Sequence, residues 1–394
     1  MALNALAIDI MLPALPYMGE ELGISNENER QLVVSIYMIG FGAAQLAFGP
    51  ITDRFGRRGP LFVGIAIYIV CTFAATFAPS FAILLALRLV QGLGAAATRV
   101  IATSIVRDRY AGREMAEVMS LTFMVFMAIP IIAPSVGQVI LLAGPWHYIF
   151  LFMGGLATLI LLWAVLRLPE TLPRERRRPF TVRAVVDGFR IVVTNRSALF
   201  YGLGGMFLFG GLFGFIVASQ QIFVGLYGLG ALFPIAFAGI AGIMAISSFL
   251  NSRIVRSFGM RRLSHGATLV YVVAAAALLW PSLTGPVPFW VFLPIILVMQ
   301  FVFGWIASNM NSLSMEPLGA VAGTAAAVFG FMQTVGGALL GTLIGQQYNG
   351  TLTPNAIGFM VMGLLTLGCI LIAEKGRLFG VGSEHVPHTP AMFD

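Results

Sequence analysis

One short charged turn constrains the fold of this chain more than any other feature. Residues 49–58, Gly-Pro-Ile-Thr-Asp-Arg-Phe-Gly-Arg-Arg, separate one long apolar run, 31–48, from a second, 61–77. Glycine permits a sharp reversal of the backbone, and arginine is favoured at a negatively charged membrane face. The pattern therefore predicts two membrane-spanning helices joined by a tight loop at the membrane surface.

The composition supports a membrane protein over a soluble one. Hydrophobic residues make up 58% of the 394 residues and charged residues only 10%, whereas soluble domains carry about 25% charged residues. Spans of about 20 residues use up nearly the whole length, which excludes a sizeable soluble domain. The net charge of +7 lies in short loops, so we expect a lipid bilayer as the partner and no nucleic acid.

Apolar runs and their breaks predict an all-α polytopic membrane protein with twelve transmembrane helices in two six-helix bundles. Domains are expected at 1–166, 167–197 (a cytoplasmic linker with an amphipathic helix over 182–193), 198–374 and 375–394 (a cytoplasmic tail). The predicted helices cover 1–18, 31–49, 60–78, 81–106, 116–142, 146–166, 198–223, 231–250, 263–282, 288–312, 321–347 and 355–374.

A weak internal repeat supports the division into two halves. Residues 55–58, Phe-Gly-Arg-Arg, recur as Phe-Gly-Met-Arg at 258–261, in the equivalent loop of the second half. Degenerate duplication of six-helix units is typical of transporters with parallel repeats.

The distribution of basic residues predicts the orientation. Of the 23 Lys and Arg residues, 20 fall in loops on the side of Arg57, and Arg30 alone falls in a loop on the other side. Because cytoplasmic loops carry the excess of basic residues, both termini are expected in the cytoplasm. Cys71 and Cys369 lie in apolar stretches, so no disulfide framework is implied.

Charged residues inside predicted spans are costly and usually functional. Asp9, Arg88 and Arg99 are the three clear cases, and Arg88 and Arg99 share a helix face because they lie about three turns apart. The stretch 1–17 is barely long enough to span a membrane, so we expect the chain to begin inside its first helix.

Several motifs together resemble the drug:proton antiporters of the major facilitator superfamily, and more narrowly their bicyclomycin-resistance (Bcr/CflA) branch. The turn at 49–58 resembles the superfamily's G-x-x-x-D-R-x-G-R-R signature, 9–16 the branch's D-x-x-L-P-A-L-P segment, and 88–92 the family's fourth-helix R-x-x-q-G motif. Residues 129–138 lie where drug antiporters carry the fifth-helix G-P-x-x-G-G motif, of which Pro134 and Gly137 remain while Ala133 and Gln138 replace two glycines. The stretches 146–150, 170–180, 251–253 and 322–325 are also similar to this branch.

The resemblance implies proton-driven export of small, mostly apolar antibiotics across the inner membrane of a bacterium, by a monomer without cofactors. It places Asp9 in the central cavity as the proton site, with Arg88 as its natural partner, and Asp53 against a helix N-terminus of the opposite half. Asp108 is expected to accept a hydrogen bond from Arg57, as part of a contact that closes the cytoplasmic side. The gating residues implied are Gly49, Asp53, Arg54, Gly56, Arg57, Arg58 and Asp108. In the bicyclomycin type a small residue is expected where Arg99 stands, which suggests other substrates.

Polar or aromatic residues in mid-helix are candidates for contact with the substrate, although a lone glutamine in a span more often bonds a neighbouring helix. These candidates are Tyr37, Gln91, Arg99, Gln300, Asn309 and Gln333, together with Gln45 and Gln220. Four scattered histidines and unpaired cysteines predict no metal site.

Other functions stay open with less support. The main alternative is proton-coupled export of a metabolite such as an amino-acid derivative. A polytopic membrane enzyme would carry clustered carboxylates or histidines near one face, which this sequence lacks, so no enzymatic activity is expected. A non-transporting sensor would have a degraded turn motif, whereas 49–58 is intact.

Overall fold

The fold of the chain is helical, as the sequence predicts. A computed structural model describes residues 2–110, 112–173, 175, 177 and 182–380, and the secondary structure within these ranges is entirely helical. Ten of the described helices are long and apolar enough to cross a membrane. With α6 (Gly112–Ala143) and a broken first segment they complete the predicted all-α membrane fold. Parts of the predicted connector (174, 176, 178–180) and of the predicted tail (381–394) lie outside the described residues.

Close packing of glycines holds the first half together. This half contains α1 (Ala2–Asp9), α2 (Leu15–Glu21), α3 (Leu32–Phe55), α4 (Arg58–Thr76), α5 (Phe81–Arg109), α6 and α7 (His147–Arg167). α3 and α4 both pack along α5. A Cβ atom added to Gly92 of α5 would lie 2.1 Å from the carbonyl oxygen of Tyr37 on α3. Small residues permit this approach of two backbones, as is usual in membranes, where apolar contact with lipid competes with helix packing.

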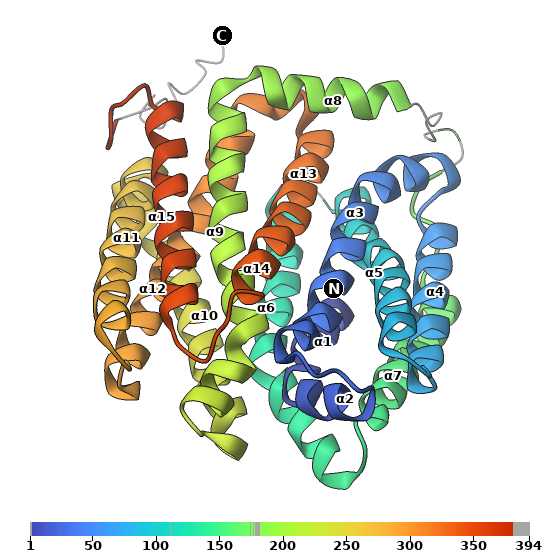
Figure 1. Cartoon of the computed structure of the whole chain (residues 1–394). Coiled ribbons are helices and arrows are strands. Elements are labelled where there is room, and N and C mark those ends of the chain that lie inside the picture. Colours follow the sequence, from blue (N-terminus) through green and yellow to red (C-terminus); the bar gives the residue numbers. More distant parts are fainter. Residues whose placement is uncertain (1, 111, 174, 176, 178–181, 381–394) are drawn as a thin grey trace.

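The second half repeats the arrangement. It contains α9 (Arg196–Gln220), α10 (Phe233–Phe258), α11 (Met260–Thr284), α12 (Phe289–Met315), α13 (Ala322–Phe331), α14 (Gly337–Gly345) and α15 (Thr353–Ala373). α9 packs against α14 and α15, and α11 against α12. The connecting helix α8 (Val182–Thr194) lies across one end of the bundle (Figure 1) and contacts α13. Val192 of α8 is fully buried there with Phe329.

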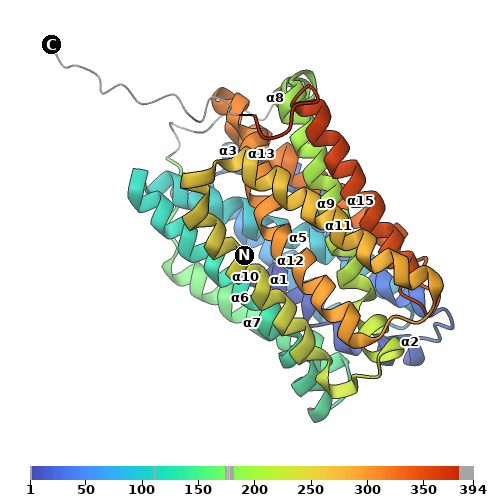
Figure 2. The same ribbon diagram turned by 90° about the vertical axis from the view of Figure 1, so that its left-hand side faces the viewer.

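The two halves meet at two places (Figures 1 and 2). α3 packs against α13 and α14, and α6 packs against α10. The end of the bundle that carries Arg57, Arg261 and α8 is called the arginine face below. The end that carries α2 and residues 346–352 is called the opposite face.

The structure corrects several predicted helix bounds. The helix expected over 231–250 continues to Phe258. The helix expected to end at residue 49 continues through Pro50 to Phe55, so the turn is reduced to Gly56 and Arg57. Gly56 ends the helix because its φ of 87° is left-handed, a conformation that glycine adopts without strain. The helix expected over 321–347 is interrupted by a π-helical turn, η7 (Met332–Gly336). The first segment, expected as one helix over 1–18, is broken after Asp9.

Candidate functional site

The break in the first segment exposes backbone beside Asp9. α1 ends at Asp9, a short 3-10 turn (Leu12–Ala14) follows, and α2 then runs from Leu15 to Glu21. Pro13 has no backbone N–H and cannot donate to the Asp9 carbonyl four residues before it, so the α-helical pattern stops there. The Asp9 side chain is 4% exposed, and no other described residue forms a hydrogen bond or ion pair with it.

α6 packs directly onto this break. A Cβ atom at Gly137 would lie 2.3 Å from the carbonyl oxygen of Ile10 and 3.1 Å from the ring of Pro13. Pro134, one turn earlier on α6, is also buried. Gly137 of the predicted antiporter motif therefore packs against the backbone next to Asp9, although it lies far from Asp9 in sequence.

Arg88 of α5 is fully buried and is held by neutral groups. Its guanidinium donates to the Val33 carbonyl (3.0 Å), the Ala7 carbonyl (2.8 Å) and Oε1 of Gln91 (2.7 Å), and its Cζ lies 4.4 Å from the Tyr37 ring centroid. These bonds tie α5 to α1 and α3. The structure does not bring the Arg88 side chain into an ion pair with Asp9, the partner that the resemblance implied.

Tyr37 and Gln91, predicted to contact substrate, are bound within this first-half network. Tyr37 donates to Asn4 Oδ1 at 2.9 Å, and the Gln91 amide donates to the Thr72 hydroxyl at 2.6 Å. Both side chains are buried. Their hydrogen-bonding groups are therefore already used in the conformation seen here.

Arg99 is less constrained than Arg88. Its side chain is partly exposed, its Cζ lies 6.0 Å from the Phe41 ring centroid, and no described residue accepts a hydrogen bond from it. Its surroundings are taken up again below.

The remaining predicted substrate contacts lie in the second half. Asn309 exchanges two hydrogen bonds with Asn251, of 2.8 and 3.4 Å, and Gln300 is buried in the same helix, α12. Gln333 lies in η7 beside Gly205 of α9. Asn309 thus joins α12 to α10, whereas Gln333 lies at the π-helical turn that adjoins α3.

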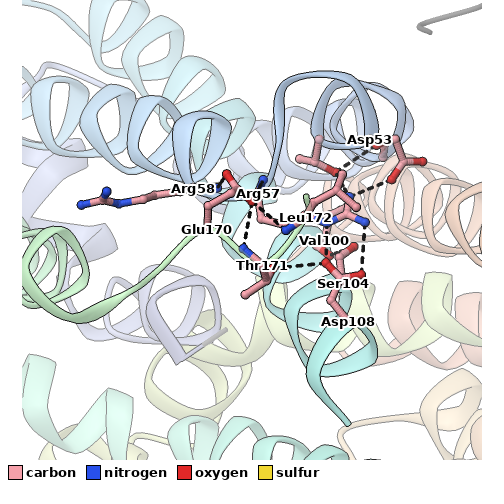
Figure 3. A network of polar contacts seen from close by, with 11 residues as sticks. Asp53, Arg57, Arg58, Val100, Ser104, Asp108, Glu170, Thr171 and Leu172 are labelled. Atoms are coloured by element: carbon pink, nitrogen blue, oxygen red, sulfur yellow. Dashed lines mark hydrogen bonds and ion pairs between the residues drawn. The ribbon is translucent and has the colours of Figure 1, made fainter. Parts of the chain in front are cut away.

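At the arginine face, the Arg57 side chain joins α3 to α5 (Figure 3). Its guanidinium donates to Asp53 Oδ1 (2.7 Å) and to the Thr52 hydroxyl (3.0 Å) on α3, and to Asp108 Oδ2 (2.8 Å) on α5. Burial lowers the pKa of Arg57, but its bonds to Asp108 and Asp53 outweigh burial and raise the pKa above its ordinary value. Arg57 is therefore a permanent positive charge that fixes the end of α3 to the end of α5.

Asp53 and Asp108 differ in how firmly they are held. The Asp108 side chain is 15% exposed and also accepts from the Thr171 hydroxyl at 3.2 Å, whereas the Asp53 side chain is 45% exposed. The described partner of Asp53 is Arg57 of the same half. Among the residues that the structure describes, no helix N-terminus of the other half contacts Asp53, so the partner implied by the resemblance stays a prediction.

Glu170, which the sequence did not mark as a functional residue, organises the same turn. Its carboxylate accepts four backbone N–H groups, from Arg57 (2.8 Å), Arg58 (3.2 Å), Thr171 (3.0 Å) and Leu172 (3.0 Å). Two of these donors begin α4, so Glu170 caps that helix. Burial on its own raises the pKa of Glu170, but the four donors together hold it below its usual range.

The other predicted gate residues surround this turn. Arg58 donates to the Val165 carbonyl at 2.7 Å and lies over the Phe62 ring, so it joins α4 to α7. Arg54 is exposed and lies over Phe55. The carbonyl of Gly49 accepts a hydrogen bond from the Thr52 hydroxyl at 2.9 Å. The role of Gly56 as the C-terminal cap of α3 could have been predicted from the sequence, whereas the role of Glu170 as the cap of α4 could not.

The second half has a counterpart of this cluster. Gly259, with φ of 79°, separates α10 from α11, and Arg261 then pairs with Glu374 (3.0 Å) at the end of α15 and with Glu316 (3.1 Å). Glu374 follows the last helix of its half, as Glu170 does in the first half. The weak repeat at 55–58 and 258–261 thus corresponds to two similar charged turns.

An uncharged cluster joins the two halves at the opposite face. The Asn28 amide donates to the carbonyls of Gln346 (3.0 Å) and Tyr348 (2.8 Å), and the Gln346 amide donates back to the Asn28 carbonyl (2.6 Å). The Gln31 amide donates to Gln221 Oε1 and to the Gly345 carbonyl. This amide cluster (Asn28, Gln31, Gln221, Gln346 and Tyr348) was not predicted, because isolated amides at helix ends have no sequence signature.

One further contact between the halves lies nearer the middle. The Gln45 amide donates to the Thr334 hydroxyl at 3.3 Å, and a Cβ atom at Gly42 would lie 2.6 Å from Val335. α3 therefore approaches η7 closely. Taken with the amide cluster, these bonds show that the halves are joined by polar contacts from the opposite face to the middle of α3.

Comparison with known proteins agrees with this geometry. The sequence model of the family described as Major Facilitator Superfamily matches residues 1–341. An uncharacterized MFS-type transporter, YdgK, of Bacillus subtilis is 31% identical, with 91% of this chain and 89% of that protein covered. The Bicyclomycin resistance protein homolog of Haemophilus influenzae is 28% identical and Multidrug resistance protein D of Escherichia coli 27%, each with 94% of this chain and 92% of the relative covered.

A solved structure has the same fold. The xylose transporter XylE from E. coli, in a partially occluded inward open conformation, superposes with a TM-score of 0.71 over 95% of each chain, at 13% identity. The matches confirm the family resemblance read from the motifs and the fold class predicted from the apolar runs.

Proposed function

This chain belongs to the major facilitator superfamily, and we propose that it is a multidrug exporter that moves small, mostly apolar antibiotics out of the cell in exchange for protons. The names of its bicyclomycin-resistance and multidrug-resistance relatives support the cargo class. Membership of a family of transporters favours transport over a membrane enzyme, and the protein is a multi-pass membrane protein.

The observation that carries proton coupling is the isolated carboxyl of Asp9. It is buried at a break in a membrane segment, with no described partner, and α1 packs against α3, α5, α6 and α7. A buried ionisable group of this kind marks a proton or substrate path in most membrane proteins, and transporter sites are typically formed by broken helices. Arg88, held by carbonyl oxygens, fixes α1 in place.

The two faces supply the gates of an alternating-access cycle. We place the arginine face in the cytoplasm, with both termini, because basic residues accumulate there. The amide cluster then lies on the outer side, and we expect it to hold that side closed while cargo binds from the cytoplasm. In the outward-open state we expect the Arg57 turn to contact the second half instead.

The driving force is sufficient. At a membrane potential of about 150 mV, one proton supplies about 3.5 kcal/mol. This supports a concentration gradient of about 300-fold. Export of a metabolite, such as an amino-acid derivative, would use the same machinery and stays the second candidate, because Arg99 adds a positive charge to the interior.

The test is a proton-release assay in proteoliposomes with an acidic interior. Added chloramphenicol or another candidate antibiotic should draw protons out of wild-type vesicles, and Asp9→Asn should abolish this release. Glu29→Gln, an exposed acid on the opposite face, is the matched control and should behave as wild type. Full drug-dependent release in Asp9→Asn would move the proton site elsewhere, and no release with any compound would contradict drug antiport.

A further inference from the structure

The charges described inside the spans do not balance. In the first half, the described residues between the two faces include two guanidinium groups, Arg88 and Arg99 of α5, and one carboxyl group, Asp9 at the end of α1. Arg88 is held by neutral oxygens and Asp9 has no described partner, so neither arginine is neutralised by a carboxylate. The interior of the first half therefore carries an excess of positive charge.

Arg99 faces inward, not toward lipid. The exposed residues Ala86, Val90 and Leu93 lie on the side of α5 opposite to Arg88, and Arg99 is rotated by only about 20° from Arg88. Its partial exposure thus arises on the side of α5 that faces α1 and α3. The neighbouring residue Phe41 precedes Gly42, which touches Val335 of the second half. Arg99 accordingly lies near the boundary between the halves.

A purely interfacial role does not fit this position. α5 has 29 residues, about 43 Å of helix, and therefore extends beyond a hydrocarbon core of about 30 Å. Arg99 lies in the half of this span nearer the arginine face, but it lies on the inward side of α5, away from the surrounding lipid headgroups. Five N–H donors then remain without an acceptor from the described protein residues, which is unfavourable inside a membrane protein.

We propose that Arg99 binds a carboxylate group of the cargo. A guanidinium pairs with a carboxylate through two parallel hydrogen bonds, and the adjacent Phe41 ring offers an apolar surface to the rest of the molecule. The preferred cargo is thus an amphiphile with an apolar body and one acidic group. This inference rests on the proposed function, since it assigns a chemical class to the compounds carried between the two halves.

The test measures binding, which does not depend on proton coupling. The purified full-length protein is titrated at pH 7 with aromatic acids and their uncharged amides, beginning with 1-naphthylacetate and 1-naphthylacetamide, and binding is followed by calorimetry. We expect wild type to bind each acid at least tenfold more tightly than its amide. Arg99→Gln should bring this ratio to about one, and Arg99→Lys should retain part of it.

Arg107→Gln removes an exposed arginine near the end of the same helix and should leave the ratio unchanged. Equal binding of acid and amide by wild type, or an undiminished preference in Arg99→Gln, would overturn the proposal. Equal binding by wild type overturns the proposal without any variant, and if Arg99→Gln folds poorly, a reduced acid preference in Arg99→Lys supports it. If wild type prefers acids and Arg99→Gln does not, the Arg99 assignment stands. Intact antiport in Asp9→Asn would then contradict the proton site alone.

Discussion

Gly137 of α6 and Ile10 lie so close that a methyl group at position 137 would be 2.3 Å from the Ile10 carbonyl oxygen. This contact places α6 against the backbone immediately after Asp9. The spacing between these two helices is therefore set by the absence of a side chain, and it bears directly on the proposed proton site.

Gly137→Ala should destabilise the protein and impair transport, because the methyl group forces α6 away from the break in the first segment. Overpacking of this kind costs about 1–3 kcal/mol. Melting temperature in detergent and drug-dependent proton release are the measurements. Gly155→Ala in α7, where an added Cβ meets nothing within 4 Å, is the control. Equal behaviour of the two variants would show that α6 moves freely at this point.

Removal of the amide cluster should favour opening of the opposite face. In Gln31→Leu combined with Gln221→Leu, three bonds are lost: the bond between the two amides, the bond from Gln31 to the Gly345 carbonyl and the bond from Gln221 to Asn28 Oδ1. At about 1 kcal/mol for each hydrogen bond, the equilibrium should move about 100-fold toward the outward-open state. Spin labels at Glu27 and Thr351, measured by electron paramagnetic resonance, should show a new population at longer distance.

Asn349→Ala is the control for this experiment, since the described bonds of the Asn349 side chain stay within residues 349–351. Its distance distribution should match that of wild type. An unchanged distribution in the double variant would mean that the amide cluster does not hold the face closed.

Asp108→Asn and Asp53→Asn should separate stability from gating. Asp108 is the better buried partner of Arg57, so its replacement should lower the free energy of unfolding by about 1–3 kcal/mol. Asp53 is 45% exposed, and its replacement should lower that free energy by less than about 1 kcal/mol while slowing transport. Thermal melting and turnover are compared for both. Unchanged turnover in Asp53→Asn would count against a role in the gate.

Glu170 should make the stability of the α3–α4 turn depend on pH. Its pKa is lowered in the folded protein, so its contribution is present above the unfolded value of about 4.3 and is lost as pH falls through the folded pKa. The difference in melting temperature between wild type and Glu170→Gln should therefore be largest at neutral pH and shrink in acid. Glu175→Gln, in the same connector, serves as the control; a difference independent of pH would refute the capping role.

The positions of the long helices could be predicted from the sequence because lipid demands continuous apolar stretches. α7 (His147–Arg167) and α15 (Thr353–Ala373) lie within two residues of their predicted bounds. Errors occurred where local backbone chemistry competes with hydropathy. Pro50 did not end α3, since membrane helices tolerate proline. The π-helical turn η7 was missed because such a turn has no hydropathy pattern of its own.

The sequence by itself determined the class of the fold, the family and the residues whose charge inside a membrane demands an explanation: Asp9, Arg88 and Arg99. Most hydrogen-bond partners were decided by the tertiary structure. Arg88 donates to carbonyl oxygens and Glu170 accepts from four backbone amides, because hydrogen-bond partners depend on which segments meet in space. The bond from Arg57 to Asp108 was expected from the sequence, whereas its bond to Asp53 was not. Hydropathy and charge are properties of a residue, whereas the pairing of Gln31 with Gln221 exists only where the two halves touch.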